Sequence, residues 1–392
     1  MTGPDRAASL RLRSEVCYGR RRVYVYSVGF STRYRSEQVI RNDPRWISAI
    51  ARHQHQYHER MSTHDDVRVR PMRRLAALLT IGLLVVGECT LPDKHDQPAQ
   101  AAGGMKISGP EAAVPDPVLV AAGDIACDPT DLHFADDSGN YCEQDLTAEL
   151  IEGQSPDVVA AVGDLQYETG QLGAFQASYE PTWGRFKNIT APAVGNHEYG
   201  TSNAQGYRDY WANRGGSDLA YAYDLGTWRI YVLNSNCSEL AKPGVAGSCS
   251  GQADWLRRDQ KANPRKCVLA YWHHARFSTS TEHENGTAVR PFWDALYAHR
   301  GDVVVSGHGH VSAIWERLAP SGARSSVGIK QFEAGGGGRS LHAMKPFNDK
   351  IDGTKRFNDE FAVLRLELHP TSYSYRFVTP AGDRFTDSKP CV

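Results

Sequence analysis

Five short apolar runs in the sequence each end in residues that can bind metal ions. The runs are VLVAAGD, DVVAAVGD, APAVGNHE, CVLAYWHH and DVVVSGHGH. Their polar ends supply, in chain order, Asp124, Asp164, Asn196 with His197, His273 with His274, and His308 with His310. Carboxylate, amide and imidazole groups form a mixed oxygen and nitrogen set, which suits borderline cations such as iron, zinc or manganese. The pattern therefore predicts a site for two metal ions.

The apolar runs themselves indicate buried strands that position these groups. Each run is four to eight residues of mostly small or β-branched apolar side chains, and each breaks into a polar loop. A glycine beside most of these groups is expected to let the backbone turn sharply after the strand. Gly309 in particular is expected to let the rings of His308 and His310 face one site. A single motif of this kind is usually structural, so the prediction rests on the five together.

Amphipathic stretches between the runs predict helices. Apolar residues recur at near-helical spacing over 143–153, 252–263 and 290–300. Strands that alternate with helices favour an α/β layered sheet, whose ligands bind beyond the carboxyl ends of the strands. Two further runs, 219–235 and 361–379, alternate in the manner of strands and predict a second sheet.

A glycine-rich patch, Gly335 to Gly338, could in principle bind phosphate. It lacks a following Lys-Ser or Lys-Thr, so a tight turn is the favoured interpretation.

The motifs GD, GDxxY, GNHE, HH and GHxH together resemble those of the calcineurin-like metallophosphoesterases, and specifically the purple acid phosphatase branch. Tyr167 in the second motif selects the branch, because in those enzymes a tyrosine phenolate binds a ferric ion. Most other members use a histidine two residues after the first aspartate, and that position is Ala126 here. The resemblance covers roughly Pro115 to Phe377. It implies an α/β fold in which a layered β-sandwich is flanked by helices, an α/β/β/α arrangement, with the metal site at the strand carboxyl ends.

The resemblance also implies how the ligands divide between two ions. The first ion, Fe(III), would be held by Asp124, Asp164, Tyr167 and His310, with Asp164 bridging. The second, a divalent Zn, Mn or Fe ion, would be held by Asp164, Asn196, His273 and His308.

Three further histidines acquire catalytic roles through the resemblance. His197 matches the histidine that contacts the phosphate. His283 matches a histidine near the leaving group, and His274 is a rival for that role. One departure affects the neighbouring substrate loop. In the family an aromatic residue, Glu and Arg commonly follow GHxH directly, whereas here residues 311–314 separate GHxH from Trp315-Glu316-Arg317.

The implied activity is hydrolysis of phosphomonoesters by a metal-activated hydroxide, as in acid phosphatases. A phosphodiesterase or nucleotidase of the same superfamily is the nearest alternative. A metal-binding module without catalysis is a further alternative from another class. The expected partner is a phosphate-ester small molecule, and the oligomeric state is left open.

The charge distribution argues against a nucleic-acid partner. Of the 44 Lys and Arg residues 16 lie at or before Arg74, as do 7 of the 45 Asp and Glu residues, which leaves 28 basic and 38 acidic residues in the rest of the chain. This acidic excess after Arg74 disfavours binding to nucleic acids, because such binding depends on cationic groups that contact the phosphates.

Residues 72–101 are predicted to be a signal peptide, and the protein is therefore expected to be secreted or extracytoplasmic. A basic start, an apolar run of 13 residues and the small-residue sequence Ala99-Gln100-Ala101 follow one another there. The run is short for a stable membrane span. An uncleaved anchor and a lipid on Cys89 are the alternatives.

The predicted signal sets the other boundaries. Residues 1–71 are Arg-rich and Lys-free, and we interpret them as a disordered extension or the product of a mis-set start codon, with a basic nucleic-acid-binding arm as the alternative. A linker is expected over 102–114, and the catalytic domain over 115–392.

Export would also explain the cysteines. Six lie beyond the predicted signal, an even number that suits disulfides in an oxidising compartment. Fifteen pairings are possible. Proximity in the sequence favours Cys127 with Cys142 and Cys237 with Cys249, which leaves Cys267 with Cys391.

Overall fold

The computed structural model describes residues 115–134, 141–240, 249–346 and 354–392, together with the backbone of three strands nearer the N-terminus. Those strands, β1 (Ser9–Tyr18), β2 (Arg21–Gly29) and β3 (Val86–Glu88), form an antiparallel sheet in the order β1-β2-β3 within a first compact unit, Met1–Ile107. The predicted extension, signal peptide and linker otherwise lie outside the described residues. Ser108–Val392 forms the second unit, described below.

Two sheets form the centre of the second unit. The six-stranded sheet has the order β16 (Gly382–Pro390), β15 (Ser372–Thr379), β14 (Val363–Leu368), β4 (Val118–Ala122), β5 (Val158–Val162) and β6 (Thr190–Ala193). The seven-stranded sheet has the order β13 (Lys355–Phe357), β11 (Ser312–Leu318), β12 (Ile329–Ala334), β10 (Val303–Gly307), β9 (Val268–His274), β8 (Trp228–Val232) and β7 (Tyr221–Leu225). The five predicted metal-site strands are β4, β5, β6, β9 and β10, and the neighbours among them are parallel.

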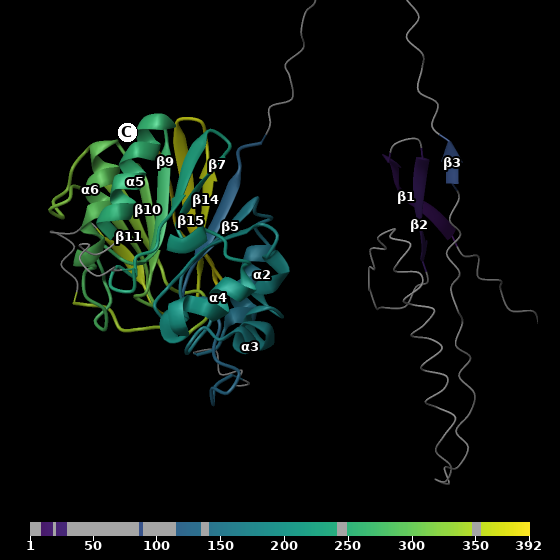
Figure 1. Cartoon of the computed structure of the whole chain (residues 1–392), viewed down its shortest axis with the longest axis horizontal. Coiled ribbons are helices and arrows are strands. Elements are labelled where there is room, and N and C mark those ends of the chain that lie inside the picture. The colour runs from purple at the N-terminus through teal and green to yellow at the C-terminus, as the bar shows by residue number, and fades with distance from the viewer. Residues whose placement is uncertain are drawn as a thin grey trace, which may run out of the picture. The chain divides into compact units, whose positions relative to one another are not determined.

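Helices cover the outer face of each sheet (Figure 1). On the six-stranded side lie α2 (Gln144–Glu152), α3 (Leu172–Ala174) and α4 (Gln205–Tyr210), and on the seven-stranded side lie α5 (Cys249–Ala262) and α6 (Arg290–Ala298). Short helical turns are η1 (Phe175–Tyr179), η2 (Trp183–Phe186), η3 (His197–Gly200), η4 (Ser202–Ala204), η5 (Gly216–Asp218) and η6 (Thr287–Val289). The three predicted amphipathic helices correspond to α2, α5 and α6, and the expected α/β/β/α fold is confirmed.

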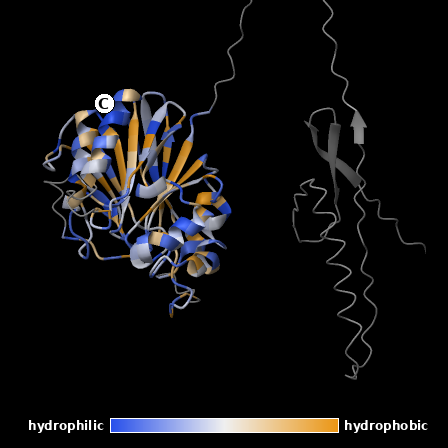
Figure 2. Ribbon diagram, viewed as in Figure 1, coloured by the Kyte–Doolittle hydropathy of each residue, from blue (hydrophilic) through white to orange (hydrophobic). Residues whose placement is uncertain are grey.

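Side-chain alternation in the central strands builds three cores from these layers. In β4, Leu119 and Ala121 face the core between the sheets, while Val120 and Ala122 face the core under α2. Strand β9 alternates in the same way between the inter-sheet core and the core under α5 and α6. Because both faces are buried, these strands are apolar along their whole length, as Figure 2 shows for the centre of the domain.

The prediction that the two alternating runs form one second sheet is wrong. The run 219–235 forms the hairpin β7–β8, which joins the seven-stranded sheet through β9, whereas the run 361–379 forms β14–β15, which joins the six-stranded sheet through β4. Each sheet therefore has parallel metal-site strands and an antiparallel hairpin beside them. Alternation indicates a strand but not the sheet in which it pairs.

All three favoured cysteine pairings are confirmed. Disulfides join Cys127 to Cys142, Cys237 to Cys249, and Cys267 to Cys391. Among the described residues, no helix combines the length and the apolarity that crossing a bilayer requires.

Candidate metal centre

The carboxyl ends of the five predicted strands meet at one edge of the two sheets. The His308 amide, after β10, donates to Oδ2 of Asp124, after β4, at 2.8 Å. The His197 amide, after β6, donates to Oδ1 of Asp164, after β5, at 2.9 Å. Through Nδ1 the His273 ring, at the end of β9, donates to the Val162 carbonyl at 3.0 Å. The contacts of His308 and His273 cross between the sheets, so the site depends on how the sheets pack together.

Four of the gathered side chains sit at sharp backbone turns. Positive φ angles occur at Asp124 (61°), Asp164 (49°), His308 (69°) and His310 (49°). Non-glycine residues rarely adopt this left-handed region, and where they do so the surrounding structure must stabilise them. The turn is thus made at the functional residues themselves.

Gly309 lies between two histidines that both face the site, but it does not make a left-handed turn itself. Its φ is not positive, and an added Cβ would lie 3.2 Å from the buried carboxylate of Glu333. Gly307 is likewise constrained by space, because a Cβ there would lie 2.6 Å from Oδ2 of Asp124. Of the glycines beside these groups, Gly163 does have a left-handed backbone, with φ of 81°. Close packing around the carboxylates therefore explains most of these glycines.

A first group of four residues consists of Tyr167 and the three side chains that surround its hydroxyl. This oxygen lies 2.9 Å from Nε2 of His310, 3.1 Å from Oδ1 of Asp124 and 3.3 Å from Oδ2 of Asp164. Nε2 of His310 is also 3.4 Å from Oδ1 of Asp124. All four residues are buried. They are the residues that the resemblance assigns to the first ion.

A second group adjoins the first through Asp164. Oδ2 of Asp164 lies 2.9 Å from Nε2 of His273, which is 3.1 Å from Nδ1 of His308. The ligand atoms of these three residues all lie within 4.8 Å of one another. Oδ1 of Asn196 is buried and has no hydrogen-bond partner among the described residues. A buried amide oxygen of this kind is suited to a cation.

The charges of the site favour bound cations. Burial, together with the nearby Asp164 charge, raises the pKa of Asp124 to about 8. Burial alone would lower the pKa of His273, but Asp164 raises it to about 9. Burial lowers the pKa of His310 to about 3 and also lowers that of His308, which leaves both rings neutral and able to donate a lone pair. Two buried carboxylates beside neutral imidazoles form a donor set that fits metal ions.

Hydrogen bonds fix the orientation of these rings. Nδ1 of His310 donates to the Ser340 carbonyl at 2.8 Å, and Nδ1 of His273 donates to Val162, so Nε2 of each ring faces the carboxylates. Such outer contacts set the ring tautomer and the ring angle in metal sites. The Asn196 oxygen, which has no partner among the described residues, and the facing nitrogens of His273 and His308 are further groups that could bind a cation. Together with the oriented rings, they give the site the donor groups that two cations need.

Glu198 of the GNHE motif holds the backbone around Asp164. Its fully buried carboxylate accepts four backbone N–H groups, those of Asp164, Leu165, Gln166 and Gly195, at 2.7 to 3.1 Å. The loop after β5 and the loop after β6 are thereby fastened to each other. Glu198 therefore positions the residue that both groups share.

The three predicted catalytic histidines lie around the two groups. His197 places Nε2 3.9 Å from Oδ2 of Asp164, and its ring centroid is 4.2 Å from that of Tyr167. The centroid of the half-buried His283 ring lies 3.9 Å from that of His308. Nδ1 of His274 is hydrogen-bonded to Ser235 at 2.8 Å, and its ring centroid is 4.4 Å from that of His308. All three rings thus adjoin the candidate ligands.

Two residues at the site were not predicted from the sequence. The His342 ring stacks on that of His310 at 3.9 Å with an interplanar angle of 4°. Arg339 lies over the Tyr167 ring at 5.4 Å and forms ion pairs with Asp131 at 2.8 Å and Glu168 at 2.6 Å. No apolar run marked this segment, because Ile329–Ala334 reads IKQFEA, and its one signal was the glycine patch that follows it. Ile329–Ala334 forms β12, which is parallel to β10 and ends at the same edge.

The glycine patch at 335–338 is part of the wall of the site. An added Cβ at Gly335 would lie 2.9 Å from Oδ2 of Asp124, and one at Gly337 would overlap the Gly123 carbonyl. The Gly123 N–H donates to the Ala334 carbonyl and the Gly337 N–H donates to the Gly123 carbonyl. The patch is therefore a close-packed connection behind Asp124 that only glycine allows.

Comparisons with known proteins agree with this geometry. Residues 130–312 match the family model described as calcineurin-like phosphoesterase. The chain is 24% identical over 215 residues to purple acid phosphatase 22 of Arabidopsis thaliana, a match that covers 48% of this chain and 46% of that protein. The chain thus spans about half the length of the curated relative it matches.

Solved structures share the fold. A purple acid phosphatase from yellow lupin (Lupinus luteus) seeds superposes with a TM-score of 0.54 at 16% identity, over 69% of this chain and 53% of that one. GAP50, described as the anchor in the inner membrane complex of Plasmodium, gives a TM-score of 0.50 at 11% identity, over 71% and 90%. Together with the arrangement of the strand ends, these comparisons show that residues 130–312 match the calcineurin-like phosphoesterase family, and that the described domain is similar in sequence and fold to purple acid phosphatases.

Proposed function

We propose that the protein is an exported phosphatase that hydrolyses phosphomonoesters at a centre of two metal ions. The observation that carries the proposal is the position of Asp164. Its Oδ2 contacts both Tyr167, in the first group, and His273, in the second, at 3.3 and 2.9 Å. One carboxylate oxygen that faces two sets of ligands can bridge two cations a few ångströms apart.

Seven residues would hold the ions. The first ion, Fe(III), takes Asp124, Asp164, Tyr167 and His310, and the second, a divalent Zn, Mn or Fe ion, takes Asp164, Asn196, His273 and His308. When bound, the ions would polarise the phosphoryl oxygens and lower the pKa of a water molecule, so that hydroxide is available under mild conditions.

The surrounding histidines would bind the phosphate and move the proton. His197 is partly exposed beside Asp164 and would donate a hydrogen bond to a phosphoryl oxygen. His283 lies over His308 on the solvent side and would protonate the alkoxide oxygen as the bond from phosphorus to that oxygen breaks. The new bond forms between phosphorus and the water oxygen, and the products are phosphate and the free alcohol. His274 is held by Ser235 deeper in the site, which favours His283 as the proton donor.

Three disulfides within the domain support the export part of the proposal, because such bonds persist in oxidising compartments.

The test is metal analysis and a visible spectrum of the purified chain, combined with assays on p-nitrophenyl phosphate and its bis ester. Two metal ions for each chain, a visible absorption band and faster hydrolysis of the monoester are expected. A preference for the bis ester would indicate a phosphodiesterase, and bound metal without hydrolysis of either compound would indicate a binding module.

A further inference from the structure

A cavity of about 420 Å³ lies beside the second ligand group. Asn196 and Tyr199 form one wall, the segment from Ser235 to Glu239 after β8 contributes another, and His274 and the loop 285–289 close it. Its size is near the lower end of the range for small-molecule sites, roughly 300 to 1,000 Å³. The cavity therefore suits a small organic group rather than a large one.

The cavity is continuous with the candidate metal centre. Asn196, whose unpaired oxygen is a predicted ligand, is part of its lining. His274, also in the lining, has its ring centroid 4.4 Å from that of His308. A phosphate held by the second ligand group would thus have one oxygen directed toward this space, which is where the alcohol part of an ester would extend.

Hydrogen-bonding groups line the inner wall. Oγ of Ser235 accepts the His274 amide N–H at 3.1 Å and is also hydrogen-bonded to Nδ1 of that ring, 2.8 Å away. The Tyr199 hydroxyl accepts from Nδ2 of Asn234 at 2.8 Å, which leaves its proton for another acceptor. This donor suits a hydroxyl or ether oxygen of an alcohol.

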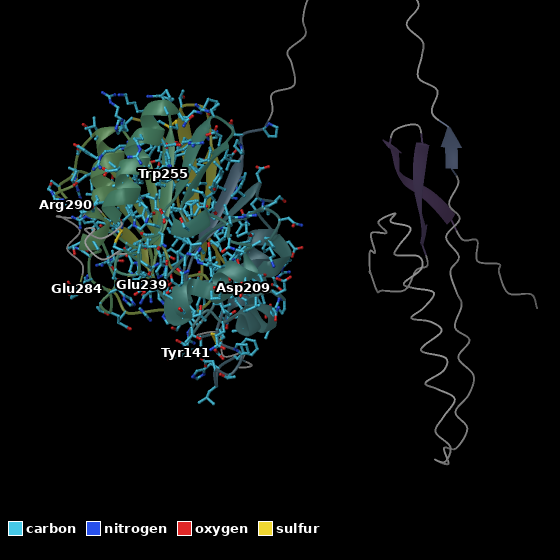
Figure 3. The ribbon with its side chains drawn as sticks, viewed as in Figure 1. Tyr141, Asp209, Glu239, Trp255, Glu284 and Arg290 are labelled. Atoms are coloured by element: carbon cyan, nitrogen blue, oxygen red, sulfur yellow. A yellow bond between two sulfur atoms is a disulfide. The ribbon has the colours of Figure 1, made fainter. Side chains whose placement is uncertain are left out.

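The charge of the cavity comes from one residue. Among the described residues that line it, Glu239 is the sole Asp, Glu, Lys or Arg. Glu239 is exposed, and Figure 3 labels it on the same side of the domain as Glu284, the neighbour of His283. The described part of the lining thus offers no Lys or Arg to pair with a second negative charge, and it adds one carboxylate.

On the basis of the proposed function, we propose that this cavity is the subsite for the alcohol part of the substrate. It takes a small alcohol that bears hydroxyl groups and is either uncharged or cationic. Glu239 selects against phosphomonoesters that carry a further anionic group, because like charges repel at short range.

The test measures catalytic efficiency on two substrates that differ by one carboxylate, glycerol 3-phosphate and phosphoglycerate, with phosphocholine as a cationic third. The wild-type protein is expected to prefer glycerol 3-phosphate and phosphocholine. Glu239→Gln is expected to raise the efficiency with phosphoglycerate, relative to that with glycerol 3-phosphate, about threefold, and Glu239→Arg about tenfold, with a smaller effect at high salt. The matched control is Glu149→Arg on α2, the same charge change at an exposed residue outside the lining, which should leave the ratio unchanged.

The outcomes separate this inference from the proposed function. Hydrolysis of all three esters with a ratio that both Glu239 variants leave unchanged overturns the role of the cavity and retains the phosphatase. A wild-type preference for phosphoglycerate likewise overturns the role of the cavity and retains the phosphatase. Absence of hydrolysis of every ester by the metal-loaded protein overturns the proposed function, and the inference with it.

Discussion

The hydroxyl of Tyr167 lies 2.9 Å from Nε2 of His310, although the two residues are 143 positions apart in the chain. Tyr167 belongs to the loop after β5 in the six-stranded sheet, and His310 follows β10 in the seven-stranded sheet. The contact therefore exists only when the two sheets are packed together. The first ligand group is a product of that packing.

Tyr167→Phe should remove the visible absorption of the protein. Tyr167 is the one phenol in the first group, and charge transfer from its phenolate to a ferric ion would give the colour. Loss of one ligand should also reduce activity, by at least the roughly 10- to 100-fold that loss of an outer contact to a ligand costs. The measurement is the visible spectrum at equal metal content, with Tyr297→Phe on α6 as the control, because Tyr297 lies outside the ligand groups. An unchanged spectrum would refute a ferric ion bound by Tyr167.

Asp164→Asn should abolish turnover, and His308→Ala should do the same. Asp164 is the residue that both groups share, so replacing its carboxylate by a neutral amide weakens the binding of both ions at once. We expect less than one equivalent of metal to remain after dialysis, measured by elemental analysis, together with a loss of p-nitrophenyl phosphate hydrolysis. Asp145→Asn, an exposed position in the first turn of α2, is the control and should retain both metals. Full metal content and activity in Asp164→Asn would contradict the bridging role.

His283→Ala should slow alkyl esters more than aryl esters. A poor leaving group needs a proton as its bond to phosphorus breaks, a contribution of about 10²- to 10⁴-fold, whereas nitrophenolate leaves without one. The measurement is kcat for glycerol 3-phosphate and for p-nitrophenyl phosphate, with exposed His299→Ala as the control. Equal losses for both ester types would show that another group protonates the leaving group. His342→Ala would then be the next variant to assay.

Glu198→Gln should weaken the loop that carries Asp164. The amide offers one acceptor oxygen in place of two, so at least one of the four bound N–H groups loses its partner and its own NH₂ faces donors. An unsatisfied buried group costs about 1 to 3 kcal/mol in the free energy of unfolding. Chemical denaturation and metal titration would measure both effects. Glu149→Gln, at an exposed position, should change neither.

Asp302→Asn should alter how stability depends on pH. Burial raises the pKa of Asp302 to about 6, although the amides of Val268 and Val392 donate to it at 2.9 and 2.6 Å. A carboxyl group whose pKa is raised on folding contributes fully below its unfolded pKa of about 4, and this contribution is lost as the pH rises through about 6. The stability of the wild type relative to the Asn variant should therefore fall by about 3 kcal/mol across that interval.

Denaturant unfolding at several pH values between about 3.5 and 7, which bracket the unfolded and folded pKa values, would measure this difference. A constant difference across the interval would show that folding does not shift the pKa of this carboxyl group. Asp145→Asn serves again as the exposed control.

Much of the site could be predicted from the sequence because each candidate ligand follows its own strand. Local signals were sufficient for the five strands, for the helices α2, α5 and α6, and for the residue types at the strand ends. Proximity in the chain also identified the Cys127 and Cys237 disulfides. These features depend on neighbours within about fifteen residues, so the pattern of side chains determines them.

Tertiary packing decided the rest. The central strands bury both faces, so their apolar runs look alike whichever sheet they join, and the hairpins β7–β8 and β14–β15 were assigned to one sheet instead of two. His342 reaches His310 because β12 lies beside β10, a pairing that no local pattern encodes. At Gly307 and Gly309 an added Cβ would press against the carboxylates of Asp124 and Glu333, which come from other strands. Contacts of this kind depend on which strands become neighbours, and that is settled by burial across the whole domain.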